Sequence, residues 1–406
     1  VFSPHDPNVL YTASQHVWRT ADAGQTWQRI SGHLTKADPK TLGPSGGPIT
    51  QDMNGPEIFA TVFTLDESPR VKGLIWAGSD DGLVHVTRDG GATWTNVTPA
   101  DLPELSRVSI VEASPHADGT AWFCAKRPLL GDRAPYIYRT RDFGRTWTRV
   151  VAGIREDDFV HVVREDPVRK DLLYAGTEHG VWVSWNAGDT WHSLSLDLPD
   201  TQVADLVVEA HDLVAGTHGR SIYVLDDIDS LRQWTPALAK RRVHVFEPRP
   251  AVRGLSPAPV DYFLAEEAET VVFEVLDASG NVVRRIESSA AVEQRVKEAN
   301  DLAEQGIGWR QPAPPPRKAG VNRYVWDLRY PGATVFDGLI VWSARPDRGP
   351  LAVPGDYRVR VTALGQSATV PYPVRIDPRL EGVSVEDLQA QFDLALRIAA
   401  AASEPP

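Results

Sequence analysis

Short apolar and polar runs follow one another in a fixed order along the first half of the chain, and this order returns several times. Each unit has an apolar run, a turn containing Pro, a second apolar run, an alternating run and a closing Gly-x-Thr-Trp. Its fullest copies are 66–94 and 164–191, and 113–147 is a looser copy. Short runs with a period of two between turn residues predict β-strands. The pattern therefore predicts four strands in each unit of about 45 residues.

The octet [ST]-x-[DN]-x-G-x-T-W closes four of these units, at 20–27, 87–94, 140–147 and 184–191. Its Asp or Asn can accept hydrogen bonds from backbone N–H groups further along the turn. Its Gly suits a positive φ, and its Trp offers a large apolar surface for packing on the next repeat. We therefore predict structural roles for Asp22, Gly24, Trp27, Asp89, Gly91, Trp94, Asp142, Gly144, Trp147, Asn186, Gly188 and Trp191.

Four-stranded units of this length are typical of β-propeller blades, which predicts a propeller over 1–235. An insertion rich in Gly, Pro and Thr spans 33–55, and the last unit keeps the phrase 214–227 without the octet. Five blades can close a ring. The abrupt start inside a repeat nevertheless favours a larger ring, with part of it supplied upstream or by another chain. The five predicted blades are 1–30, 56–98, 106–151, 158–196 and 202–234.

A different pattern begins near Lys240 and predicts a β-sandwich over 240–380. The run 271–286 reads as a hairpin around Ser279-Gly280-Asn281, and further β-rich runs follow after 320. Between them, 290–318 is predicted to be an insertion, with a helix that ends at Gly306 and a Pro-rich loop. The whole chain is therefore predicted to be all-β apart from short helices.

The chain finishes with a predicted amphipathic helix over 384–402. Ser384 and Asp387 are spaced as a capping pair, and Leu388, Phe392, Leu394 and Ile398 fall on one stripe. A single helix has nothing of its own to bury this stripe against. We expect it to dock on the sandwich, on a partner, or on sequence beyond this chain.

Composition excludes several classes of function. A formal net charge of −12 argues against a nucleic-acid binder. A single cysteine, Cys124, excludes an internal disulfide and a Cys-based metal cluster. The sequence contains no apolar run of the roughly 18 residues that a membrane helix needs. Fingerprints of dinucleotide, P-loop and hydrolase-elbow sites are missing, and His5, His16, His33, His85 and His161 lack the spacing of metal ligands, so neither a cofactor nor a metal is expected.

Candidate chemistry lies on the rim opposite the octets, where the turns between second and third strands meet. Carboxylates there could serve glycoside hydrolysis, which needs two carboxyl groups at a set separation. The candidate catalytic residues are Asp80, Asp81, Asp158 and Glu178, although polar residues in short hairpin turns are usually solvated turn residues. Arg and His on the same rim suit a carboxylate or phosphate ligand. The candidate ligand-binding residues are His16, Lys126, Arg127, His179, His218 and Arg220.

The octet resembles the Asp-box, or bacterial neuraminidase repeat, of sialidases, xyloglucanases and sortilin-type β-propellers. The phrases 47–63, 159–184 and 213–227 resemble a bacterial family, often labelled glycosyl hydrolase or sortilin-type, that joins an Asp-box propeller to a C-terminal sandwich. The sandwich itself resembles the immunoglobulin-like domain of the flagellar hook-capping protein. The resemblance implies an exported protein, periplasmic or extracellular. The three-Arg, Tyr–Glu signature of sialidases cannot be assembled from the matching positions.

Two functions follow from these patterns. The first is a non-catalytic interaction or scaffold propeller, possibly within a larger assembly, with a protein partner or the upstream part of the same propeller beside it. The second is a glycoside hydrolase or carbohydrate-binding protein that uses rim carboxylates. The missing catalytic constellation favours the first.

Overall fold

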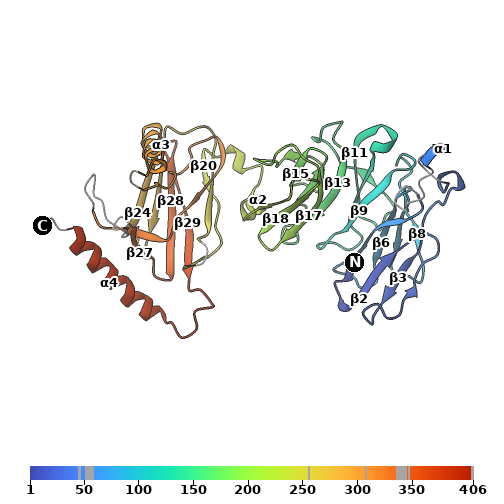
Figure 1. Cartoon of the computed structure of the whole chain (residues 1–406), viewed down its shortest axis with the longest axis horizontal. Coiled ribbons are helices and arrows are strands. Elements are labelled where there is room, and N and C mark those ends of the chain that lie inside the picture. Colours follow the sequence, from blue (N-terminus) through green and yellow to red (C-terminus); the bar gives the residue numbers. More distant parts are fainter. Residues whose placement is uncertain are drawn as a thin grey trace. The chain divides into compact units, whose positions relative to one another are not determined.

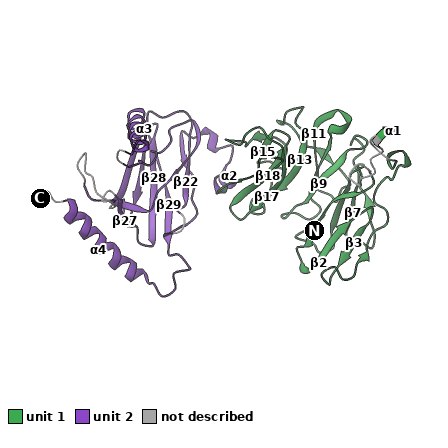
Figure 2. Cartoon of the chain, in the orientation of Figure 1, with its two compact units in different colours: residues 1–228 green, residues 229–406 purple. Residues whose placement is uncertain are grey.

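The computed structural model describes residues 1–43, 47–50, 59–254, 257–306, 309–334, 345 and 348–403. The chain divides into two compact units, Val1–Ile228 and Asp229–Pro406 (Figure 2). Both units are built mainly from antiparallel sheets, which confirms the predicted all-β class (Figure 1). The predicted insertion 33–55 falls in part outside the described residues; inside it lie the turn η1 (Pro39–Thr41) and the short helix α1 (Gly47–Thr50).

Unit 1 consists of consecutive sheets in which each strand pairs with the next one along the chain. This simple up-and-down order is that of propeller blades. Four of the sheets have four strands, and the fifth has three within the described residues. The first three sheets contain β1 (Phe2–Ser3), β2 (Asp6–Ala13), β3 (Val17–Thr20) and β4 (Gln28–Arg29); β5 (Val62–Glu67), β6 (Ile75–Ser79), β7 (Val84–Thr87) and β8 (Thr95–Asn96); β9 (Arg107–Ala113), β10 (Ala121–Arg127), β11 (Asp132–Thr140) and β12 (Thr148–Arg149), with η3 (Pro128–Leu130) before β11. The last two contain β13 (Val160–Glu165), β14 (Leu173–Thr177), β15 (Gly180–Ser184) and β16 (His192–Ser193); β17 (Val203–Glu209), β18 (Asp212–Thr217) and β19 (Ile222–Leu225).

Each octet forms the turn between the third and fourth strands of its blade. In the first octet, Thr26 donates its backbone N–H and its hydroxyl to the two carboxylate oxygens of Asp22, at 2.9 and 2.6 Å. These hydrogen bonds lower the pKa of Asp22 to about 2, so the side chain remains an ionised acceptor. Thr20 donates to the same carboxylate and accepts from the N–H of Gly24. The turn therefore satisfies its polar groups internally, as its residue types predict.

The Trp of the second, third and fourth octets packs on the preceding blade, which corrects the expectation that it packs on the next repeat. The indole N–H of Trp94 donates to the carbonyl of Ile30 at 2.8 Å, and Trp147 and Trp191 repeat this contact one blade further on. The accepting residue always follows the fourth strand of the blade before. Trp27, in the first blade, is 40% exposed, whereas Trp191 is 2% exposed.

Unit 2 is a β-sandwich with two main sheets. One has the order β20-β22-β25 and the other β21-β29-β28-β23-β24, and all pairs are antiparallel except β21–β29. A small sheet pairs β26 with β27. The strands are β20 (Val243–Val245), β21 (Ala251–Val252), β22 (Pro259–Leu264), β23 (Thr270–Leu276), β24 (Val282–Ser289), β25 (Gly320–Val325), β26 (Arg329–Pro331), β27 (Arg348–Leu351), β28 (Gly355–Ala363) and β29 (Gln366–Arg375).

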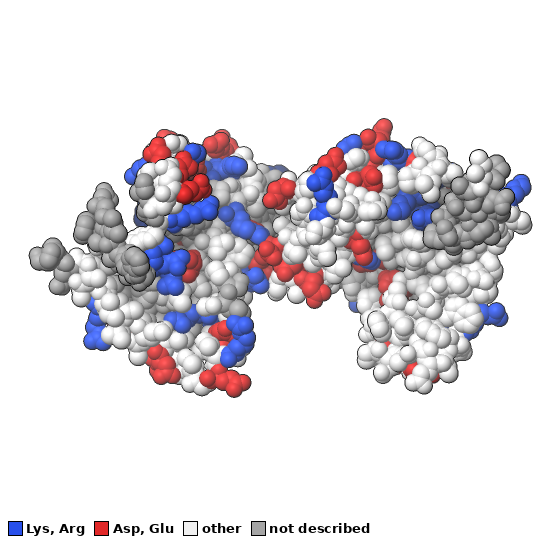
Figure 3. Space-filling view, viewed as in Figure 1, with Lys and Arg blue, Asp and Glu red and all other residues white. Residues whose placement is uncertain are grey.

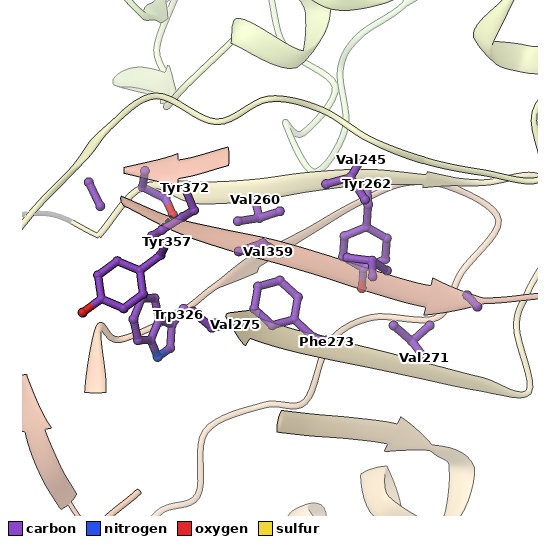
Figure 4. Packing of buried hydrophobic residues seen from close by; sticks show 14 of the residues in the cluster. Val245, Val260, Tyr262, Val271, Phe273, Val275, Trp326, Tyr357, Val359 and Tyr372 are labelled. Atoms are coloured by element: carbon purple, nitrogen blue, oxygen red, sulfur yellow. Dashed lines mark hydrogen bonds between the residues drawn. The ribbon is translucent and has the colours of Figure 1, made fainter. Parts of the chain in front are cut away.

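Side chains from both sheets meet in one core (Figure 4). The ring of Trp326 lies 5.7 Å from that of Tyr357 and 5.8 Å from that of Tyr372. The hydroxyl of Tyr372 donates to the carbonyl of Ala258 at 2.8 Å, so this buried polar tip has a partner. Two mostly antiparallel sheets around one apolar core are the architecture of immunoglobulin-like sandwiches.

The helices of unit 2 lie where the sequence places them. Helix α3 (Ala290–Glu304) begins at Ser289, whose hydroxyl accepts from the N–H of Val292, and it connects β24 to β25. Helix α4 (Val385–Ser403) begins with hydrogen bonds between Ser384 and Asp387. It docks on the sandwich, with Phe392 4.8 Å from the ring of Tyr330.

The boundary between the units differs from the predicted one. The short helix α2 (Asp229–Gln233) and Trp234 were predicted to belong to the fifth blade. The ring of Trp234 instead lies 5.4 Å from that of Phe263, in β22, and the turn η4 (Leu238–Lys240) follows. After β19 the chain leaves the blade and enters the sandwich, so the described part of the fifth blade lacks a fourth strand.

Candidate functional site

A hollow of about 450 Å³ lies where the first strands of the blades converge. Its lining comes from the ends of β5, β9, β13 and β17 and from Phe2 of the first blade. The turns that follow these strands contact the octets directly, because the N–H of Gly90 donates to the carbonyl of Gly73 at 3.0 Å. We call it the channel hollow, and it lies toward the octet rim, not the rim that the sequence analysis selected.

Four acidic residues, Asp66, Glu67, Glu112 and Glu165, line the channel hollow together with Arg164. Arg164 donates to Glu112 at 2.9 Å, to Asp205 at 2.9 Å and to the carbonyl of Leu206 at 3.0 Å. Glu112 also accepts from the N–H of Glu165 at 3.2 Å. Asp66 accepts from the N–H of Ala113 at 2.7 Å. Each side chain thus bridges to the next blade, and together they form a chain of polar contacts around the hollow.

Burial raises the pKa of both carboxyl groups, and their charged neighbours differ. Burial, followed by the negative charge of Glu112, raises the pKa of Asp66 to about 8, so Asp66 is mainly protonated at pH 7. Burial also raises the pKa of Glu112, but the contact with Arg164 opposes that rise and favours the charged form. Arg164 has its own pKa raised by Glu112 and Asp205 against the cost of burial. Two carboxyl groups with raised pKa values and different charged neighbours are the kind of pair that can supply acid–base chemistry on a glycosidic bond.

These three residues are not among the predicted site residues, although the repeat contains a signal for them. Asp66, Glu112 and Arg164 occupy the same position, two residues before the Ser or Asp of the Pro turn. Each is a charged residue near the end of a first strand that also contains buried apolar residues. Such a position is expensive to bury unless neighbours satisfy it, which makes it informative.

Three of the predicted catalytic carboxylates serve as acceptors inside their own rim. Asp80 accepts from the N–H groups of Ala60 and Thr61. Asp81 accepts from the N–H of Lys36 at 2.8 Å and from the hydroxyl of Ser79 at 2.6 Å.

Asp158 is fully buried and accepts from Thr177, His179 and Trp182. Saturated buried acceptors of this kind brace a turn. These contacts support a structural role for Asp80, Asp81 and Asp158, and their catalytic role stays a prediction.

The fourth predicted carboxylate belongs to a chain of polar contacts across three blades. The Nζ of Lys126 lies 2.6 Å from Nδ1 of His161, and Nε2 of His161 lies 3.1 Å from Glu178. Burial and the charge of Lys126 lower the pKa of His161 to about 3, so the imidazole is neutral. Its Nδ1 then accepts from the ammonium and its Nε2–H donates to Glu178. Gln202 lies 3.3 Å from the same Nδ1.

The other predicted ligand-binding residues remain dispersed. His16 contacts the carbonyl of Gly32 at 2.7 Å, Arg127 pairs with Asp132 at 2.8 Å, and His179 pairs with Asp200 at 2.8 Å. His218 and Arg220 are exposed in the turn between β18 and β19. The structure therefore brings Lys126 and Glu178 together through His161, and it does not assemble the remaining rim residues into one site.

Among the described residues, no three His, Cys, Asp or Glu side chains are placed to hold a metal ion, and no helix is long and apolar enough to cross a membrane. On the face of each unit seen in Figure 3, acidic side chains lie among basic ones.

Comparison with known proteins gives distant similarities. No family model matches the chain. An oligoxyloglucan reducing-end-specific xyloglucanase from Emericella nidulans is 25% identical over 150 residues, which are 36% of this chain and 17% of the relative. The chain thus matches about a sixth of the length of this relative.

Solved β-propeller enzymes have a similar arrangement of strands. A GH74 xyloglucanase from Xanthomonas campestris is 15% identical, with a TM-score of 0.42 over 70% of this chain and 41% of that one. A GH74 enzyme from Niastella koreensis is 12% identical, with a TM-score of 0.40 over 90% of this chain and 55% of that one. Both TM-scores lie below 0.5, and neither structure assigns a role to any residue of this chain.

Proposed function

We propose that the propeller is part of a carbohydrate-active protein of the glycoside hydrolase type, and that its chemistry lies in the channel hollow. One observation carries this proposal: Asp66 and Glu112 line one hollow of about 450 Å³, where burial raises the pKa of both groups and Arg164 donates to Glu112. A hollow of this volume is in the usual range for a small-molecule site. The similarity to a xyloglucanase supports a glucan as the substrate class.

The roles follow from the two environments. Asp66, which retains its proton near neutral pH, would donate that proton to the oxygen of the breaking glycosidic bond. Glu112, in its ionised form beside Arg164, would stabilise the positive charge that develops on the sugar or activate the attacking group. Arg164, which donates to Glu112, would favour the negative charge of that carboxylate. We propose a periplasmic or extracellular location for this protein, because its polysaccharide substrate would lie outside the cell.

The test uses xyloglucan oligosaccharides and a matched set of carboxylate variants. We expect Asp66→Asn and Glu112→Gln each to lower turnover by at least about 100-fold, the usual contribution of a general acid or base. Glu178→Gln is the control, because this carboxylate belongs to the contact chain with Lys126 and His161 on the opposite rim. Its turnover should stay within about threefold of the original, and thermal melts should confirm that all three variants fold.

Two results would contradict the proposal. Loss of turnover in Glu178→Gln alone would move the chemistry to the opposite rim. An original chain that cleaves none of the oligosaccharides would remove the hydrolase assignment. The second candidate function, a protein-interaction propeller, would then stand on the exposed apolar edge of β19, where Ile222 is 68% exposed and Val224 51% exposed.

A further inference from the structure

Three blades share a seat for the octet Trp, and the seat around Trp191 is the most completely buried. Ile137, Val150, Leu173 and Ala175 belong with Trp191 to one buried cluster, and we call these four residues the walls of its seat. Val150 also accepts the indole N–H at 2.9 Å. Two of these walls come from the preceding blade and two from the second strand of the Trp's own blade.

The same four walls exist one blade further on. Leu194 follows β16 as Val150 follows β12, and its N–H donates to the carbonyl of Val181 at 2.8 Å, as that of Val150 does to Ile137. Leu213 pairs with the last residue of β19, as Leu173 pairs with the last residue of β15. The counterparts of the walls around Trp191 are therefore Val181, Leu194, Leu213 and Ala215.

These four counterparts line a hollow of about 80 Å³. The hollow is several times larger than the roughly 10–15 Å³ that one water needs, and its lining is mostly apolar. The fifth blade has no octet and no fourth strand within the described residues, so it has no Trp of its own to place there. The hollow is the space that an octet Trp fills in the other blades.

The strand beside the hollow is an open edge. In the structure β19 pairs only with β18 among the described residues, and its side chains Ile222, Tyr223 and Val224 are 68%, 37% and 51% exposed. Its counterpart β15 pairs on both sides, and Val181 and Val183 there are almost completely buried. An exposed apolar edge strand is a template for pairing with another chain.

We propose that this hollow is a vacant tryptophan seat, and that a β-strand of another polypeptide pairs with β19 and inserts a Trp against Leu194. The three filled seats define the chemistry of that strand: an extended segment with Thr-Trp, entered from a Gly turn. Backbone hydrogen bonds to β19 supply the pairing, and the indole supplies the selectivity. The proposal is independent of the channel carboxylates.

The probe is a fluorescein-labelled peptide with the sequence of residues 87–98, TRDGGATWTNVT, which contains one Trp. Its control carries Ala in place of that Trp. By fluorescence anisotropy with the full chain, we expect the Trp peptide to bind at least about tenfold more tightly than the Ala peptide. Ala215→Leu fills the hollow from β18, and it should weaken binding of the Trp peptide at least about tenfold.

The matched protein control is Ala175→Leu, at the same position of the filled seat. Because Trp191 already occupies that seat, this variant should lower the Tm by several degrees, whereas Ala215→Leu should leave it unchanged or raise it. Equal affinity for both peptides, failure of the Trp peptide to bind, or full binding to a folded Ala215→Leu variant would overturn the proposal. So would a dimer of the original chain that Ala215→Leu dissolves, because a second copy would then fill the seat.

Discussion

The contrast between Trp191 and Trp27 gives a quantitative test of how the blades hold together. Both close an octet, but Trp191 is 2% exposed and Trp27 is 40% exposed. A Trp side chain buries up to about 250 Å², so this difference corresponds to about 95 Å². At about 25 cal/mol per Å², that area contributes about 2.4 kcal/mol. The hydrogen bond from Trp191 to Val150 adds about 1 kcal/mol.

We therefore expect Trp191→Ala to lower the free energy of unfolding by about 4–5 kcal/mol, within the range for a buried Trp. Trp27→Ala should lower it by about 1 kcal/mol. In a unit of 228 residues each kcal/mol shifts the Tm by about 2–4 °C, so the two melts should differ by at least about 6 °C. Circular dichroism of the intact chain measures both. Equal losses in the two variants would refute the idea that each octet Trp is held by the preceding blade.

Two further predictions concern the channel and the turns. The pKa of Asp66 is raised from near 4 to about 8 on folding, so the folded state binds more protons in this window. The free energy of unfolding should fall as the pH rises from 5 to 8, by at most about 1.4 kcal/mol per pH unit, and urea titrations should find a flatter profile in Asp66→Asn; identical profiles would contradict the raised pKa. Gly91→Ala should destabilise the protein more than Gly90→Ala by at least about 1 kcal/mol, because both have positive φ but only at Gly91 would the new Cβ meet another residue, at 2.6 Å from the carbonyl oxygen of Ile30. Equal melts of the two glycine variants would argue against that contact.

The octets could be predicted because their interactions are local. Asp22 and Thr26 are four residues apart, and their hydrogen bonds follow from the residue types alone. The direction in which Trp94 packs is a different matter, because a period along the chain does not say which neighbour a side chain meets. The end of the fifth blade was predicted at Trp234 for a similar reason. The ring that contacts Trp234 belongs to Phe263, which lies in the sandwich, far along the sequence.

The candidate site could be predicted less well, because it depends on how the blades curve. A turn carboxylate such as Asp81 looks available in the sequence, yet backbone N–H groups of Lys36 and Ala37 saturate it. Asp66 and Glu112 lie near the ends of first strands, and they can be recognised as site residues only when these strands converge on one hollow. The sequence shows that these residues recur at one position of the repeat. Their contact partners lie in different blades, so the sequence alone does not identify them.

The backward direction of the Trp contacts bears on how the protein is made. A ribosome releases the chain from the N-terminus, and folding units form in that order. Because Trp94, Trp147 and Trp191 each bind the blade already synthesised, every new blade finds its docking surface complete when its own octet emerges. A forward-facing Trp would wait, exposed, for a surface still to be translated. The architecture is thus suited to vectorial assembly, with little aggregation-prone surface left uncovered during synthesis.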